Sequence, residues 1–153
     1  MKKIILYLAM FGILQADVEV SKVVIDLTTG NIQTFEKKLL KGIVAHKTHY
    51  EGNLKELEVA VVIHGGAYRF FVKEPKNSPF KEEKKLIEAQ TDLKKRISSM
   101  VDTYDVTFLM CKSGLDRLKL DSEDIYNFVH MVPNAAIGLI DKQNEGYAYI
   151  PVQ

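Results

Sequence analysis

ELEVAVVIHGG, residues 56–66, is apolar without interruption from Val59 to Ile63 and then stops at a histidine and two glycines. A short apolar run that is rich in β-branched residues and bounded by glycine is typical of a strand buried on both faces. Such strands belong to parallel sheets that are covered by helices on both sides. The stretch therefore predicts a buried parallel strand over residues 57–64, followed by the turn His64-Gly65-Gly66.

Other apolar runs of strand length occur on both sides of this one, and we predict strands at residues 22–28, 104–111, 128–132 and 147–152. The run at 128–132 also fits the end of a helix, because its apolar residues are spaced at a helical step. Between the strands, apolar stripes with steps of three and four residues predict helices at residues 31–52, 84–101 and 134–146. A further short helix is expected to start at a capping residue, Asp121 or Ser122.

The predicted elements alternate strictly between strand and helix, with connections of a dozen or more residues. Connections of that length are what neighbouring parallel strands require. The fold class predicted from the residues is therefore α/β, a three-layer α/β/α arrangement with a parallel sheet, in a single domain over residues 20–153.

The composition is that of an ordinary globular protein. The chain has 153 residues, of which 46% are hydrophobic and 27% charged, and its formal net charge is +1. A charge this close to zero, with no RNA-binding signature, speaks against a nucleic acid as partner.

The first sixteen residues, MKKIILYLAMFGILQA, differ from the rest. Lys2 and Lys3 precede an apolar run from Ile4 to Leu14. This order predicts that residues 1–16 are a secretory signal peptide, and the run is too short to span a bilayer comfortably. The alternative is a buried first strand. On the signal-peptide interpretation the mature protein is periplasmic or otherwise exported and has no membrane anchor.

Cys111 is the only cysteine of the chain. An unpaired cysteine in an exported protein indicates a reactive thiol or an intermolecular bond. It ends the third predicted strand, His64 ends the second, and Thr29-Gly30 follows the first. Carboxyl ends of parallel strands meet at one edge of a sheet, so we expect these residues to lie together with the sulfur open to solvent. The alternative is that Cys111 is only buried packing.

Several neighbours suit a thiolate at that edge. Lys112 and Arg117 would favour the anionic sulfur, and the backbone N–H groups of Gly65 and Gly66 could form an anion-binding concavity. His64 is either a hydrogen-bond donor or base beside the thiol, or a residue that only satisfies a backbone carbonyl. Together with Thr29, Gly30 and Tyr68, these residues form the predicted pocket.

No metal or cofactor is indicated. His46 and His49 share a helix face, but no third ligand is placed by spacing, and a solvated helix face explains them better. Neither the dinucleotide-binding nor the P-loop glycine pattern occurs.

The ordered set VVIDLTTG, VAVVIHGGAYRFFV, YDVTFLMCKSGL and NEGYAYIPV resembles the DsrE/DsrF-like sulfur-relay family. The resemblance implies a mainly parallel five-stranded sheet and assembly into a homotrimer or homohexamer. In sulfur-carrying members the cysteine that matches Cys111 accepts sulfur as a persulfide, and the family's histidine and glycine match His64 and Gly65. Many relatives have proline where this chain has Gly66, which implies a more flexible loop here.

Two functions are thus open. The first is an exported sulfur carrier, or sulfurtransferase, in which Cys111 accepts sulfane sulfur and exchanges it with a donor or acceptor protein. The second is a non-enzymatic, oligomeric small-ligand-binding protein in which Cys111 only lines the pocket.

Overall fold

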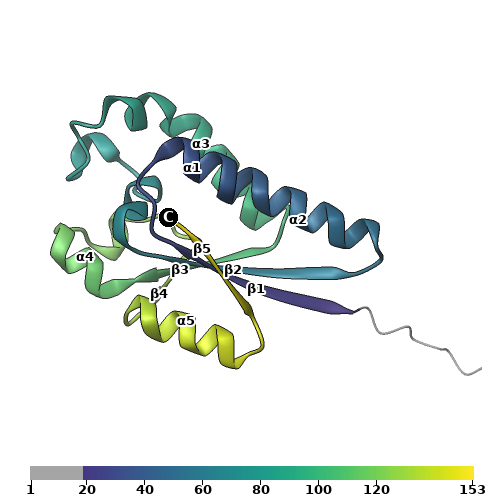
Figure 1. Cartoon of the computed structure of the whole chain (residues 1–153). Coiled ribbons are helices and arrows are strands. Elements are labelled where there is room, and N and C mark those ends of the chain that lie inside the picture. Colours follow the sequence, from purple (N-terminus) through teal and green to yellow (C-terminus); the bar gives the residue numbers. More distant parts are fainter. Residues whose placement is uncertain (1–18) are drawn as a thin grey trace, which may run out of the picture.

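Five strands form one parallel sheet in the order β4-β3-β2-β1-β5 (Figure 1). The computed structural model describes residues 19–153. The strands are β1 (Val20–Leu27), β2 (Glu56–Ile63), β3 (Val106–Cys111), β4 (Val129–Val132) and β5 (Ala148–Val152).

The first long helix of the chain is built of α1 (Ile32–Thr34), the π-helical segment η1 (Phe35–Leu40) and α2 (Lys41–Gly52). The other helices are α3 (Lys84–Asp102), α4 (Lys112–Leu118) and α5 (Ala135–Asn144). Three 3₁₀ turns complete the connections: η2 (Gly65–Phe70), η3 (Pro75–Asn77) and η4 (Ser122–Asp124).

The direction in which the chain crosses the sheet decides which face each helix covers. From β1 to β4 the strands are added in one direction, and α1, α2 and α3 lie on one face (Figure 1). β5 then returns to the far side of β1. Because crossovers are right-handed, a reversal of direction places the next helix on the opposite face. Figure 1 shows α5 on that opposite face, and α4 beyond the end of the sheet.

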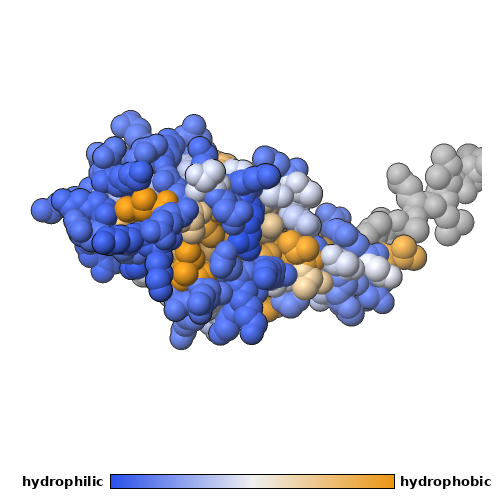
Figure 2. Space-filling model, turned by 90° about the horizontal axis from the view of Figure 1, so that it is seen from above, coloured by the Kyte–Doolittle hydropathy of each residue, from blue (hydrophilic) through white to orange (hydrophobic). Residues whose placement is uncertain are grey.

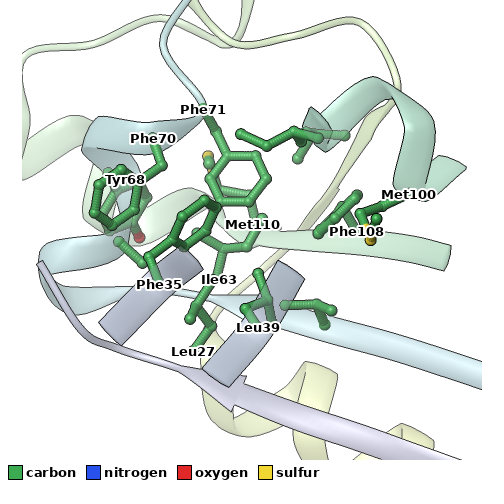
Figure 3. Packing of buried hydrophobic residues seen from close by; sticks show 14 of the residues in the cluster. Leu27, Phe35, Leu39, Ile63, Tyr68, Phe70, Phe71, Met100, Phe108 and Met110 are labelled. Carbon is green, nitrogen blue, oxygen red and sulfur yellow. The ribbon is translucent and has the colours of Figure 1, made fainter. Parts of the chain in front are cut away.

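The two faces carry cores of different size. Under α1–α3, Phe71 packs edge-on against Phe35 and tilted against Phe108, with ring centroids 6.0 and 5.1 Å apart (Figure 3). Under α5 lies a smaller cluster of Val24, Ala60 and Val62. The larger core carries most of the buried apolar area, which is the main favourable term in folding.

A groove between α2 and α3 lies on the helical face that Figure 2 views. It has a volume of about 550 Å³ and a largely apolar lining, which includes Leu40, Val44, Met100 and Tyr104. Apolar side chains surface there between charged ones (Figure 2). The groove lies on the face of the sheet opposite α5.

The structure confirms the predicted α/β fold, with five parallel strands and helices on both faces, and residues 128–132 contain a strand. The prediction of a helix that starts at Asp121 or Ser122 is wrong. Asp121 caps only the 3₁₀ turn η4, and the helix of this region is α4, which starts directly after Cys111. The segment at 67–72 lies largely in the 3₁₀ turn η2. The predicted signal peptide, residues 1–16, lies outside the described residues.

Among residues 19–153, no helix combines the length and the apolar character that crossing a membrane requires.

Candidate functional site

The carboxyl ends of the five parallel strands lie at one edge of the sheet. Ile63 at the end of β2 pairs with Met110 in β3, so His64 and Cys111 are the next residues on neighbouring strands. On the other side of β2, the His64 N–H donates to the Leu27 carbonyl at 3.1 Å. The structure thus brings together residues at the carboxyl ends of the first three strands, as expected from a parallel sheet.

The face on which each side chain lies follows from strand alternation. Val24, Val62 and Leu109 pack in the cluster under α5. Two positions further along β1 and β2 are Asp26 and His64, so these two side chains lie on the α5 side of the sheet. Cys111, at the end of β3, packs with the larger cluster, and its thiol also meets the backbone N–H of Ala135 at the start of α5.

Cys111 is buried, with 3% of its surface exposed. The expectation that the sulfur is open to solvent is therefore wrong. Its surroundings are polar: Sγ lies 3.2 Å from Ser113 Oγ, and the residue precedes α4 as its N-cap. α4 folds back over the strand end and covers the sulfur. The sequence analysis did not predict this short helix.

The pKa of the Cys111 thiol is lowered relative to an ordinary thiol. Burial raises this pKa, but the hydrogen bond to Ser113, the Tyr68 hydroxyl and the backbone N–H groups of Gly114 and Ala135 together lower it by more. Ala135 is the first residue of α5, so the amide at the start of that helix contributes. The lowering comes from hydroxyl and amide groups rather than from Lys112 and Arg117, which are both exposed.

Tyr68 fixes the backbone on which the sulfur is carried. It is 2% exposed, and its hydroxyl donates to the Cys111 carbonyl at 2.6 Å. Burial, followed by interaction with the Cys111 side chain, raises the pKa of Tyr68 far above that of an ordinary phenol, so the hydroxyl keeps its proton. Beside it lies a cavity of about 290 Å³ that is lined by Gly65, Tyr68, Gly114, Arg117 and Leu118. Arg117 therefore borders this cavity, as predicted for the pocket, whereas Lys112 is not among its lining residues.

His64 is hydrogen-bonded to the carboxylate of Asp26, which the sequence analysis did not predict as a site residue. Its Nε2 lies 2.6 Å from Asp26 Oδ1, and the other oxygen of Asp26 accepts a hydrogen bond of 2.6 Å from the Tyr149 hydroxyl. Asp26 is 8% exposed. The signal that could have found it is a charged residue inside the otherwise apolar run VVIDL, residues 23–27, since buried charges are nearly always paired.

Gly66 does not offer a free amide, although the predicted anion-binding concavity used it. Its N–H donates to the Thr28 carbonyl at 2.9 Å. Gly65 next to it has φ +60°, a backbone conformation that glycine adopts without strain. Thr29 is buried and accepts a hydrogen bond from the Asn31 N–H at 3.2 Å, and Gly30 packs against Gly66. This turn is closely packed, and the flexibility expected from the absence of proline stays a prediction.

In the described part of the chain, no group of three histidine, cysteine or carboxylate side chains is arranged to hold a metal ion.

Comparison with known proteins identifies the family. The sequence profile described as "DsrE/DsrF-like family" matches residues 22–152. The chain belongs to the DsrE/DsrF-like family.

Two relatives illustrate how far this likeness reaches. An uncharacterized protein of Aquifex aeolicus (strain VF5) is 29% identical over 131 residues, which are 85% of this chain and 55% of that protein. The chain thus spans about half the length of this relative. A solved structure, the protein of unknown function MTH1491 from Methanobacterium thermoautotrophicum, has a TM-score of 0.58 at 18% identity, over 86% of this chain and 98% of that one. The second likeness shows that the DsrE-like fold is shared.

Proposed function

We propose that this DsrE/DsrF-like protein is a sulfur carrier in which Cys111 accepts sulfane sulfur as a persulfide and passes it on. The family is associated with sulfur relay. The observation that carries the proposal is the polar setting of the Cys111 sulfur, which lies 3.2 Å from Ser113 Oγ and where two hydroxyls and two backbone amides lower the pKa of the thiol. A thiolate is the nucleophilic form of cysteine, so this setting prepares the sulfur for attack.

The transfer step balances without a further oxidant or reductant. With thiosulfate as donor, the Cys111 thiolate attacks the sulfane sulfur and forms a new S–S bond. The bond between the two sulfur atoms of thiosulfate breaks, and sulfite leaves with the electron pair. The product is the Cys111 persulfide anion, and attack by an acceptor thiolate on its outer sulfur returns the original thiolate.

Burial of the sulfur favours a small donor. The cavity of about 290 Å³ beside Tyr68 and Gly114 borders the first turn of α4, the helix that covers Cys111. Because α4 has only seven residues, a local opening of its first turn exposes the sulfur without disturbing the sheet. Arg117 at the cavity attracts an anionic donor.

Intact mass measurement tests this function. After incubation with thiosulfate or polysulfide, the wild-type protein should gain the mass of one sulfur atom, and dithiothreitol should remove it. Cys111→Ser should gain nothing, because the described chain has no other thiol. If the wild-type mass stays unchanged with every sulfane donor, or if Cys111→Ser gains the same mass, Cys111 is not a sulfur acceptor.

Export and assembly complete the proposal. The pattern of residues 1–16 supports delivery to the periplasm or another exported location, where the donor and acceptor proteins would also act. A homotrimer or homohexamer is the expected assembly. Ile137 and Ile140 on α5 and Ile150 on the edge strand β5 are exposed apolar residues that suit a subunit contact. Light scattering that shows only a monomer would contradict this assembly.

The second candidate is a non-enzymatic, oligomeric small-ligand-binding protein in which Cys111 only lines the pocket. The 3% exposure of Cys111 favours it, since buried cysteines often serve only as packing. In that case the native thiol reacts slowly with alkylating reagents at every pH, and sulfane donors leave it unmodified.

A further inference from the structure

Asp26 links two side chains that come from strands on either side of β1. Its carboxylate accepts a hydrogen bond of 2.6 Å from Tyr149 on β5 and lies 2.6 Å from Nε2 of His64, which follows β2. The His64 side chain is 30% exposed, whereas that of Asp26 is 12% exposed. The result is a continuous chain of hydrogen bonds, Tyr149–Asp26–His64, along the carboxyl edge of the sheet.

The hydrogen positions in this chain follow from the chemistry of its members. The hydrogen bond to Asp26 raises the pKa of Tyr149, so the phenol keeps its hydrogen and donates it. An ionised carboxylate only accepts hydrogen bonds, so Nε2 of His64 must carry a hydrogen as well. In the neutral imidazole the other nitrogen, Nδ1, then holds a free lone pair. Among the hydrogen bonds of the described residues, His64 uses only Nε2 of its ring.

The chain ends next to Cys111. His64 and Cys111 come directly after Ile63 and Met110, the last pair between β2 and β3, so they occupy adjacent positions on neighbouring strands. A base with a free lone pair and an ionisable thiol thus occupy neighbouring strand ends, and a fixed carboxylate holds the base from the other side. This order of groups is that of a nucleophile, a base and the residue that orients the base.

We propose that Asp26 is a positioning residue that holds His64 in the Nε2–H form, so that Nδ1 is the basic atom for proton transfer at Cys111. The inference rests on the proposed sulfur-carrier function and adds to it the means by which the thiol loses its proton. Nδ1 takes the proton from Cys111 Sγ, directly or through one water, as the thiol becomes the attacking thiolate. Asp26 stabilises the resulting imidazolium, which returns the proton to solvent when the leaving group departs.

Other charged groups around His64 are few. Asp26 comes from β1, Tyr149 from β5 and Cys111 from β3, and the first turn of α5 holds no acidic residue. The exposed cations of α4, Lys112 and Arg117, have no lone pair with which to accept the thiol proton. Asp26 is therefore the carboxylate that can stabilise a charged His64 by direct contact.

Nitrogen NMR of the free protein tests the orientation without any sulfur transfer. In protein labelled with ¹⁵N at histidine, neutral His64 should show a protonated Nε2 and an unprotonated Nδ1. In Asp26→Asn this preference should be lost, because the new amide can donate a hydrogen bond as well as accept one. A wild-type His64 that is protonated at Nδ1 when neutral overturns the inference.

The pH profile of persulfide formation tests the consequence for the reaction. At about pH 6.5, well below the ordinary thiol pKa of about 8.5, Asp26→Asn and His64→Gln should each slow the reaction about tenfold or more. At about pH 9.5 a thiol ionises without a base, so the rates of the variants should approach that of wild type. A merely structural role of Asp26 would slow the reaction equally at both pH values.

Glu58 provides the matched control. It accepts a hydrogen bond of 2.9 Å from Tyr147, so it forms a second tyrosine–carboxylate pair. This pair lies near the start of β2, away from the carboxyl ends of the strands, where the candidate site is. Glu58→Gln should leave both the NMR signature and the pH profile unchanged. If wild type forms the persulfide and Asp26→Asn matches it across the whole pH range, the inference fails while the sulfur-carrier function stands. If wild type forms no persulfide, the function itself fails.

Discussion

Gly66→Ala should lower the free energy of unfolding by about 3 kcal/mol, near the upper end of the usual cost of overpacking. A Cβ at position 66 would lie 2.7 Å from the backbone nitrogen and 2.9 Å from the Cα of Gly30. Both are main-chain atoms, so no side chain can move aside, and the turn after β1 must shift. That turn is also held by the hydrogen bond from the Gly66 N–H to the Thr28 carbonyl. Denaturant unfolding monitored by circular dichroism measures the loss.

Gly30→Ala is the control for this prediction, because it lies on the other side of the same contact. There the nearest atoms belong to the flexible end of the Arg69 side chain, the closest at 3.1 Å. Arg69 can adjust, so the expected loss is below about 1 kcal/mol. Equal losses for Gly66→Ala and Gly30→Ala would show that the close backbone approach is not what requires glycine at position 66.

Gly114→Ala should also destabilise the fold, by about 2 kcal/mol, and should increase the reactivity of Cys111. The added Cβ would lie 1.9 Å from the hydroxyl oxygen of Tyr68, whose side chain is buried and cannot rotate freely. Tyr68 must then release the Cys111 carbonyl, and the first turn of α4 is displaced from the sulfur. Faster alkylation of Cys111 in the variant, beside the lower unfolding free energy, checks this result.

Gly42→Ala serves as the matched helical control. It lies in α2, and its Cβ would meet only the Lys37 carbonyl at an ordinary distance of 3.8 Å. Alanine inside a helix is favoured over glycine by about 0.5–1 kcal/mol, so this variant should be more stable than wild type. A Gly114→Ala variant that is as stable as Gly42→Ala would contradict the packing of Tyr68 on α4.

The sequence predicted the sheet well because its strands are marked by local patterns. Continuous apolar runs such as Val59–Ile63 can be buried on both faces only in a covered parallel sheet. The helix capped by Asn134 was equally visible, and the structure shows the cap, with the Ile137 N–H donating to the Asn134 side chain at 3.0 Å.

The helix α4 was missed because what stabilises it is not local. Lys112-Ser113-Gly114 has the composition of a turn, and glycine disfavours a helix interior. In the structure this glycine is needed because Tyr68, 46 positions earlier in the chain, packs where its side chain would be. A contact of this kind leaves no trace in the periodicity of residues 112–118.

The candidate site was predicted in part for the same reason. The strand-end rule placed His64 and Cys111 on neighbouring strands, but it could not show that His64 is bonded to Asp26, a partner 38 residues away. Nor could it show that the sulfur is covered. Such features depend on the register of the strands and on where α4 folds back, and neither follows from residue type.

The central claim is that this fold holds Cys111 ready to ionise, and the pH dependence of its alkylation tests this most directly. In native protein the rate of reaction with iodoacetamide should rise with an apparent thiol pKa below the ordinary value of about 8.5. Ser113→Ala should move that pKa upward, because it removes a hydrogen bond that favours the thiolate. An apparent pKa at or above about 8.5, or alkylation only as fast as the protein unfolds, would contradict the account.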